Sequence, residues 1–375
     1  MIIMRYIILL RHITLLRKNV SVRQITLLRK NVSARRNILM RGARHIKSMI
    51  LCALLMSAVT GQSQDKPLVL STASMMNDMA RNIGGDNFTY ATVVPIGSDP
   101  HLYEPTPGDA RMCHGASIIL MNGLTFEGWL AKLIKNSGTE ALIKTITEKI
   151  DAIASEQYAN ATDPHAWMSA ANGLVYIQNI RDAFIAFMPE KEQEFRDNYN
   201  LYKTKIEKLD QYILIRIKSI PVEKRILITS HDAFQYYGRR YDIRLEAILG
   251  TSTDADVQTS DVQRLNEVIK STAVAAVFIE STISPRLLGQ IAKDNGIVVG
   301  GKLYADSLSD EDGPAGTYLK MLRHNTDVIY DGLMLPRKDP GDATDAENGF
   351  NWLWALLLTP IALALMVLIA RIFNK

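Results

Sequence analysis

Residues 190–220 read EKEQEFRDNYNLYKTKIEKLDQYILIRIKSI, a stretch without glycine or proline that lies between Pro189 and Pro221. Its apolar residues recur every three or four positions, at Phe195, Tyr199, Tyr202, Ile206, Leu209, Ile213 and Ile217. This spacing places them on one face of a helix, and the two prolines limit its length. At ~1.5 Å per residue the helix would be roughly 45 Å long. We expect one stiff connection that allows little hinge motion.

On either side of this helix, short apolar runs alternate with amphipathic patterns. Strands are expected at 68–71, 90–95, 116–121, 225–229, 275–279 and 297–299, and helices at 74–83, 124–135, 259–271 and 284–295. Such alternation is typical of parallel α/β layers. We therefore predict an α/β fold in which two lobes with parallel-type sheets, at 64–189 and 221–335, are joined by the helix at 190–220.

The N-terminal region differs in charge from this body. Residues 1–48 contain nine Arg and three Lys but no acidic residue, so the net charge of +4 comes from this region and the rest is acidic. This distribution argues against nucleic-acid binding. The stretch ITLLRKNVS occurs at 13–21 and again at 25–33. We treat 1–39 as a basic leader outside the mature protein, with a basic amphipathic arm as the alternative.

Residues 40–63 have the layout of an export signal. Three basic residues precede an apolar run at 49–59 that is too short to span a bilayer, and small residues follow it. Cys52 lies in that run and is not preceded by a small residue, so we do not expect lipidation there. Removal of the signal leaves Cys113 without a partner for an intramolecular disulfide.

The C-terminal region reads as a membrane anchor. Residues 350–369 carry no charge, and about 20 helical residues at ~1.5 Å each cross a bilayer core. Trp352 and Trp354 stand at one end, and Arg371 and Lys375 at the other, as interfacial aromatics and cytoplasmic positive charges do. We predict a transmembrane helix at 350–371 after a polar linker at 336–349.

Three of the seven histidines stand in loops or beyond predicted strands. His101 and His165 each follow Asp-Pro, in SDPHLYEPTPGD (98–109) and DPHAWM (163–168), and His231 follows the strand at 225–229. Asp306 similarly follows the strand at 297–299. Sites in α/β sheets gather beyond the carboxyl ends of strands. Three imidazoles and one carboxylate suit a four-coordinate transition metal, so these residues predict a metal site in the cleft between the lobes.

A set of motifs extends this prediction. SDPHLYEPTPGD and DPHAW, together with NGLTFEGWL (122–130), TSHDAFQYY (229–237), VFIES (277–281) and LYADSL (303–308), resemble the TroA-like (cluster A-I) solute-binding proteins. These are metal-binding receptors of bacterial ABC transporters for zinc and manganese. The resemblance covers about residues 67–333. It implies two α/β lobes joined by one rigid helix, and it assigns the metal ligands to His101, His165, His231 and Asp306.

Two carboxylates in the same motifs are candidates for supporting roles. The resemblance suggests that Glu104 and Glu280 accept hydrogen bonds from ligand imidazoles or hold their loops. Ordinary loop or helix-cap hydrogen bonding is the alternative for both residues.

The resemblance implies capture of Zn²⁺ or Mn²⁺ as the transported ligand and delivery to an ABC permease with a cytoplasmic ATPase subunit. Affinity should fall at low pH, because imidazole must be neutral to bind metal. We expect a monomer without enzymatic activity, at the periplasmic face of the inner membrane and anchored by the C-terminal helix. The alternatives are a zinc-dependent hydrolase with Glu280 as the base, and a surface adhesin.

Three departures from the family bear on these expectations. Zinc-specific members often carry a His-rich loop between the first two ligands, but 102–164 contains only His114. Manganese-specific members often place Glu where this chain has His231. Most relatives are free in the periplasm or lipid-anchored rather than held by a C-terminal helix. The first two departures conflict, so the physiological metal stays open at this point.

Overall fold

The computed structural model describes residues 66–154, 161–254 and 256–337. The predicted leader and signal, most of the linker, and the predicted anchor at 350–371 lie outside the described residues. No helix within the described ranges is long and apolar enough to cross a membrane.

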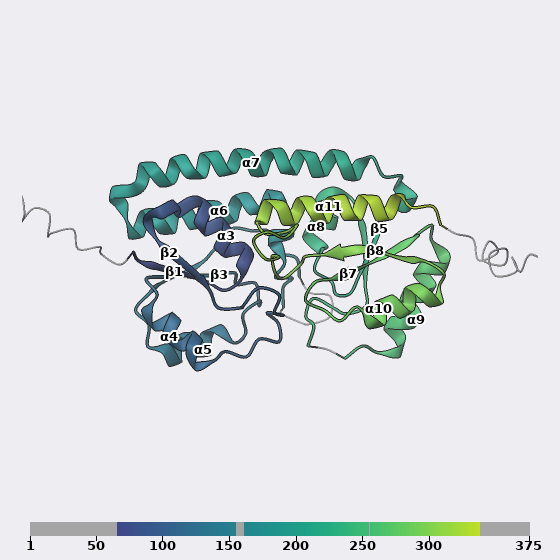
Figure 1. Ribbon diagram of the computed structural model, residues 1–375, viewed down its shortest axis with the longest axis horizontal. Helices are drawn as coiled ribbons and strands as arrows, with labels where there is room; N and C mark the ends of the chain where they lie inside the picture. Colours follow the sequence, from purple (N-terminus) through teal and green to yellow (C-terminus); the bar gives the residue numbers. More distant parts are fainter. Residues whose placement is uncertain (1–65, 155–160, 255, 338–375) are drawn as a thin grey trace, which may run out of the picture. The chain divides into compact units, whose positions relative to one another are not determined.

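The first half is built on a four-stranded parallel sheet with the order β2-β1-β3-β4. Its strands are β1 (Leu68–Ser71), β2 (Thr89–Thr92), β3 (Ile118–Met121) and β4 (Leu142–Thr145). Figure 1 shows α3 (Ser74–Gly84) and α6 (Ala170–Phe187) on one side of this sheet, and α4 (Pro107–Gly115) and α5 (Leu130–Ser137) on the other. The central strands β1 and β3 are almost wholly buried and apolar, as expected for a parallel sheet covered on both faces.

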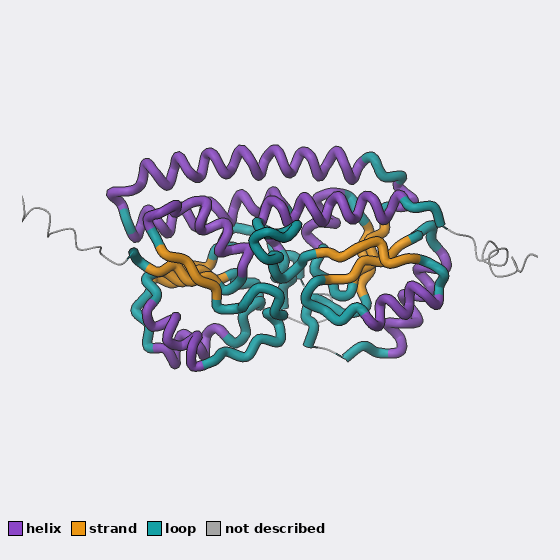
Figure 2. The backbone as a smooth tube through the Cα atoms, in the orientation of Figure 1, coloured by secondary structure: helices purple, strands orange, loops and turns teal. Residues whose placement is uncertain are grey.

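The second half has two parallel strand pairs. They are β5 (Ile226–Thr229) with β6 (Arg244–Ala247), and β7 (Ala276–Glu280) with β8 (Val298–Leu303). The pairs lie side by side through β5 and β7 (Figure 2). The helices of this half are α8 (Gln235–Tyr241), α9 (Thr259–Ser271), α10 (Arg286–Asp294) and α11 (Tyr318–Met334). Short 3₁₀ turns are η1 (Gly85–Asn87), η2 (Ala166–Met168), η3 (Pro189–Lys191) and η4 (Val222–Lys224).

The helix predicted at 190–220 is present as α7 (Glu192–Lys218). Pro189 starts the short turn η3 immediately before it, and Pro221 follows its end. Its buried side chains include those of Phe195, Tyr202, Ile206, Leu209, Ile213 and Ile217. The helix runs past both halves and packs against α3, α6 and α11 (Figure 1). Each fully buried apolar side chain of this size contributes about 1.5–3 kcal/mol, so this face holds α7 firmly on both halves.

The two halves share one hydrophobic core. A single cluster of buried side chains includes Val69 from β1, Ile206 from α7, Phe278 from β7 and Tyr318 from α11. Two smaller clusters lie under the outer helices, one in each half. The helix at 190–220 therefore separates the chain into two segments, but the side chains of these segments pack into one common core.

Several predicted elements are shorter in the structure than in the sequence analysis, and one of the helices differs most. The helix expected at 124–135 begins only at Leu130, because the chain before it forms an irregular loop. Leu124 and Thr125 have φ of 51° and 64°, in the left-handed region where helix cannot continue. This loop places Phe126 beside the site described below.

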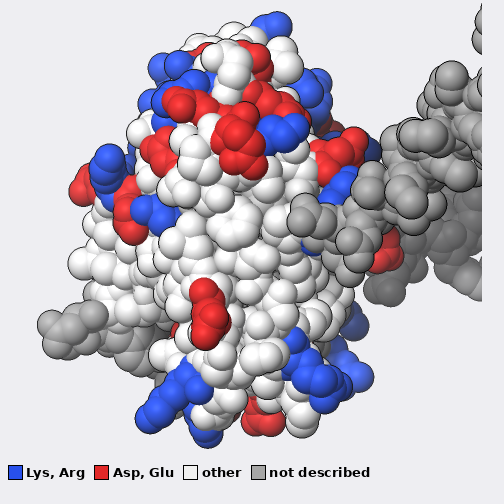
Figure 3. Space-filling view, turned by 90° about the vertical axis from the view of Figure 1, so that its left-hand side faces the viewer, with Lys and Arg blue, Asp and Glu red and all other residues white. Residues whose placement is uncertain are grey.

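Charged side chains of both signs are mixed on the surface. Figure 3 shows the first-half end of the molecule, with Lys, Arg, Asp and Glu gathered at the top, where α7 lies, and few charges across the middle. On α7 opposite charges pair along the helix, as between Arg196 and Glu192. Among the described side chains visible on this face, basic and acidic residues are interspersed at the top, and no large basic patch of the kind that binds nucleic acid is seen.

Candidate metal centre

Four side chains converge where several strands end. His101 lies in the loop between β2 and α4, and His165 immediately precedes η2. His231 follows β5 by two residues, and Asp306 follows β8 by three. One ligand atom from each lies within 4.8 Å of the others. The structure thus brings together all four residues that the sequence proposed.

The distances between these atoms match a single small cation. The Nε2 atom of His165 lies 3.3 Å from Nε2 of His101 and 3.4 Å from Nε2 of His231. The Asp306 carboxylate lies 3.3 Å from His165, 3.2 Å from His231 and 3.9 Å from His101. A tetrahedral site with metal–ligand bonds of ~2.0–2.1 Å has ligand–ligand edges of about 3.3–3.4 Å. The four groups therefore have the spacing of a metal's ligand shell.

Two of the imidazoles are oriented by carboxylates on their far side. Nδ1 of His165 lies 2.8 Å from Asp163 Oδ1, and Nδ1 of His231 lies 2.7 Å from Glu280 Oε2. A proton on Nδ1, held by the carboxylate, leaves the Nε2 lone pair directed at the centre. Two such Nε2 atoms cannot donate to each other, so their close approach favours a cation between them.

The same carboxylates set the charge of the metal-free site. Burial alone would lower the pKa of His165, but Asp163 and Asp306 outweigh it and raise that pKa to about 9. Burial is likewise outweighed at His231, where Glu280 and Asp306 raise the pKa well above its usual value. Protons on these two rings therefore occupy the place of the cation when no metal is bound.

Asp306 supplies the negative charge at the centre. Its side chain is fully buried, and within the described chain its two oxygens face the imidazoles and accept no other hydrogen bond. Burial would raise its pKa, but the positive charges on His231 and His165 outweigh burial and hold the pKa well below its usual range. A buried carboxylate of this kind needs a positive partner, either imidazolium or metal.

His101 differs from the other three ligands. Its ring is about 5% exposed, whereas the side chains of His165, His231 and Asp306 are fully buried. Its backbone N–H donates to Asp99 Oδ1 at 2.9 Å, and its ring packs edge-on against Phe126. Burial lowers the pKa of its ring to about 4, although Asp306 opposes this shift. His101 is therefore neutral and ready to bind metal at neutral pH.

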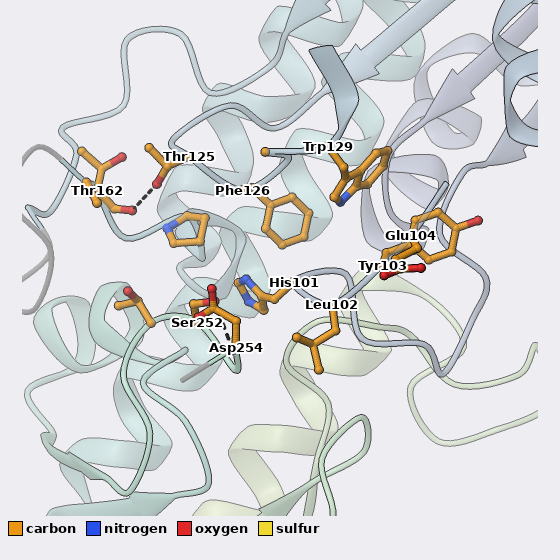
Figure 4. Close-up of a pocket in the computed structure, with 14 residues that line it drawn as sticks. His101, Leu102, Tyr103, Glu104, Thr125, Phe126, Trp129, Thr162, Ser252 and Asp254 are labelled. Atoms are coloured by element: carbon orange, nitrogen blue, oxygen red, sulfur yellow. Dashed lines mark hydrogen bonds between the residues drawn. The ribbon is translucent and has the colours of Figure 1, made fainter. Parts of the chain in front are cut away.

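A cavity opens outward from His101. Figure 4 shows the ring surrounded by side chains of both halves, with Phe126 and Trp129 from the first and Ser252 and Asp254 from the second. Glu104 lines the same cavity and is exposed. Of the four candidate ligands, only His101 contributes to this lining.

The two carboxylates proposed for supporting roles lie in different places. Glu280, the last residue of β7, contacts the ring of His231 and also accepts a hydrogen bond from its backbone N–H. The structure does not bring Glu104 to any of the candidate ligands, because its side chain points into the open cavity. The two remaining described histidines lie elsewhere, since His114 contacts Ser137 and His324 contacts Lys302.

Sequence reasoning missed three supporting residues. Asp163 orients His165, Asp99 holds the backbone of His101, and Trp167 donates from Nε1 to the carbonyl of Ala305 at 2.9 Å. A signal for the first two was present, because the motif Asp-Pro-His places an aspartate two residues before each histidine. No local signal pointed to the contact of Trp167, which joins residues 138 positions apart.

Comparison with known proteins gives consistent matches over the described body. A family model described as "Zinc-uptake complex component A periplasmic" matches residues 69–332. The manganese ABC transporter substrate-binding lipoprotein PsaA of Streptococcus pneumoniae is 30% identical over 72% of this chain and 90% of its own length. The periplasmic zinc binding protein TroA of Treponema pallidum has a similar structure, with a TM-score of 0.68 and 31% identity over 72% of this chain and 99% of its own. A Mn-bound periplasmic metal binding protein of Candidatus Liberibacter asiaticus matches with a TM-score of 0.66 and 33% identity, over 72% and 100%.

Proposed function

The chain belongs to the zinc-uptake complex component A family of metal ABC transporter substrate-binding proteins, and we propose that it captures Zn²⁺ or Mn²⁺ outside the cytoplasm and delivers the ion to a permease. As a member of this family it is a solute-binding receptor and not an enzyme. The metal is its cargo.

One observation carries the assignment of the site. Three Nε2 atoms and one carboxylate, from four separate loops, lie within 4.8 Å of one another. This supports His101, His165, His231 and Asp306 as the metal ligands. The contacts of Asp163 and Glu280 with the far nitrogens of two ligands support them as the groups that orient the rings.

The donor set and the relatives point to different metals. Three imidazoles and one carboxylate favour zinc over manganese by ligand softness. Of the relatives described above, PsaA is named for manganese and TroA for zinc. We propose that the site accepts both ions and that supply in the surroundings decides which is carried.

The partner is an ABC permease with a cytoplasmic ATPase subunit, as in the transporters that PsaA and its relatives serve. The receptor works on the extracytoplasmic side. Attachment by a helix at 350–371 stays a prediction, since the relatives are named lipoproteins and this segment lies outside the described residues. Membrane extraction at high pH tests it, because a chain shortened to residue 349 should become soluble if the anchor is real.

The two alternatives are not favoured. A zinc hydrolase needs an open coordination position and a free general base, whereas Glu280 is already engaged with His231. The family relationship is to transport receptors, and it gives no separate support for a role as an adhesin.

The direct test is metal stoichiometry and competition on the purified chain. After removal of metal, Zn²⁺ and Mn²⁺ are titrated separately and together, and bound ions are counted by mass spectrometry. We expect one equivalent, lost or strongly weakened in His231→Ala. Absence of tight binding by the wild type for either ion would overturn the proposal.

A further inference from the structure

The loop that carries His165 belongs to the first half by sequence but is bonded to both halves. Within the first half, Asn122 Nδ2 donates to the carbonyl of Pro164 at 2.9 Å and Thr125 donates to the carbonyl of Thr162 at 3.0 Å. Four hydrogen bonds join the loop and the start of α6 to the second half. Tyr236 Oη donates to Asp163 O at 3.0 Å and Tyr318 Oη to Trp167 O at 2.7 Å, whereas Trp167 Nε1 donates to Ala305 O at 2.9 Å and Ala170 N to Tyr241 Oη at 3.2 Å. The side chain of Trp167 is fully buried. This packing fixes His165 relative to the second half.

The hydrogen bond from Trp167 also joins the loops that carry two of the candidate ligands. Ala305 immediately precedes Asp306, and Trp167 follows His165 by two residues. The loops of His165 and Asp306 therefore form one connected unit. His231 belongs to the same unit, because Glu280 at the end of β7 holds both its ring and its backbone.

The loop of His101 has fewer hydrogen bonds to the second half than the loop of His165. Trp129 donates from Nε1 to the carbonyl of Pro100 at 3.1 Å, and further along the loop Tyr103 donates to Asp109 at 2.8 Å. Two hydrogen bonds near His101 cross to the second half: Asp99 accepts from Thr253 at 2.6 Å, and Gly97 donates to Ser307 at 2.8 Å. The residues of this loop that make these bonds are not buried, because Gly97 is exposed and Asp99 is only partly buried.

The surroundings of the rings follow the same division. His165, His231 and Asp306 are fully buried, whereas His101 has exposed area and lines the cavity that opens to solvent (Figure 4). An ion that leaves through this cavity has to pass His101. An ion that arrives meets His101 first.

We propose that the site works as three ligands plus one. His165, His231 and Asp306 form a preassembled half-site on the second half, and His101 is the exchange ligand whose movement admits and releases the ion. Trp167 is the positioning residue that joins His165 to this half-site. This inference rests on the proposed function. It differs from a division by sequence, in which His101 and His165 would move together as the first-half pair.

The first experiment compares His101→Ala with His165→Ala in the full chain, using Co²⁺ and Zn²⁺. We expect His101→Ala to retain one equivalent, with release to a chelator accelerated at least about 100-fold, the upper end expected for loss of a supporting contact. Its Co²⁺ absorption should weaken as water replaces imidazole. His165→Ala should lose stoichiometric binding. Equal losses in the two variants would overturn the inference.

The second experiment uses two tryptophans with matched bonds. Trp129 donates to the residue before His101, and Trp167 donates to the residue before Asp306. Phe at either position removes the N–H and keeps an aromatic ring. In a double-mutant cycle with His101→Ala, the effect of Trp129→Phe on affinity should vanish and that of Trp167→Phe should persist unchanged. Loss of the Trp167→Phe effect in that background would contradict the three-ligand half-site.

Two controls keep these results interpretable. Tyr318→Phe removes a bond to the same loop and should act like Trp167→Phe, which covers the case in which the latter does not fold. Circular dichroism checks that each variant is folded. Failure of the wild type to bind metal would overturn the proposed function, whereas wild-type binding with equal losses at His101 and His165 overturns only this inference.

Discussion

Glu280 holds His231 at two points, because Oε2 lies 2.7 Å from Nδ1 of the ring while Oε1 accepts the backbone N–H of the same residue at 2.9 Å. One carboxylate at the end of β7 thereby sets both the position of the loop after β5 and the orientation of its ring. The ligand is fixed before any metal arrives, so little order has to be created on binding.

Replacement of Glu280 by Gln should weaken metal binding by about 10–100-fold, the usual cost of removing such a partner from a ligand histidine. Gln has nearly the same shape but cannot hold the Nδ1 proton as firmly. Glu104→Gln is the matched control, because Glu104 is exposed and touches no ligand. The metal affinity of the Glu104→Gln variant should change by less than about threefold. Competition with a chelator of known affinity measures both, and equal losses would refute the role of Glu280.

Metal capture at pH 7 should release about two protons, because a metal displaces the protons on the ligand nitrogens of His165 and His231. The pKa of His165 is about 9 and that of His231 lies well above its usual value, so both rings are protonated in the metal-free chain. Apparent affinity should therefore rise with pH up to about 9. Calorimetry in buffers of different ionisation enthalpy counts the protons, and a value near zero would contradict this charge assignment.

The stability of the metal-free chain should change in the opposite direction. The raised pKa of His165 stabilises the fold fully below the unfolded-state pKa of about 6.5. That contribution is lost as pH rises through about 9. We expect the melting temperature of the metal-free chain to fall between these values and that of the loaded chain to hold or rise. Parallel melting curves across this range measure the difference.

Carboxylates at the mouth of the cavity should speed the arrival of the ion. Glu104 and Asp254 both line the cavity outside His101. The double variant Glu104→Gln, Asp254→Asn should slow association by about 2–10-fold at low salt, since negative charge in a cleft raises the local concentration of cations. Dissociation should be unchanged. Stopped-flow traces at two ionic strengths separate the two rates, and a salt-independent effect would argue against electrostatic attraction.

The contact between α6 and α11 near the site should be intolerant of added volume. A Cβ on Gly173 would lie 2.6 Å from Oη of Tyr318, whose hydroxyl bonds the carbonyl of Trp167. Gly173→Ala should lower the free energy of unfolding by about 1–3 kcal/mol. Gly289→Ala in α10 is the control, because nothing lies within 4 Å of its Cβ position. That change should stabilise the chain by up to about 1 kcal/mol. Chemical denaturation compares the two.

Local patterns in the sequence predicted the long helix and the parallel α/β character well. The regular spacing of Phe195, Ile206 and Ile213 survives as the buried face of α7, because helix periodicity needs only neighbouring residues. Short strands such as β6, with the sequence RLEA, were missed. The alternation of polar and apolar residues in RLEA spans only four positions, too few to identify a strand, and the segment pairs with β5 in the structure.

The four candidate ligands were accessible from sequence because each stands beyond a strand or in a marked loop, and parallel strands end at one edge. Their supporting contacts were accessible only in part. Asp163 was missed although it is two residues from His165 in the same motif. Glu280 was named only through the family resemblance, because it reaches His231 across 49 positions.

The sequence by itself determined the fold class, the long helix and the residues of the candidate metal centre, because periodicity and strand ends are local properties of the chain. Only the tertiary structure decided which half holds each ligand. Trp167 donates a hydrogen bond to Ala305, 138 positions away, and accepts one from Tyr318, 151 positions away. These two bonds attach the loop of His165 to the half that follows α7. Such long-range hydrogen bonds depend on the packing of side chains in a shared core, which no local pattern encodes.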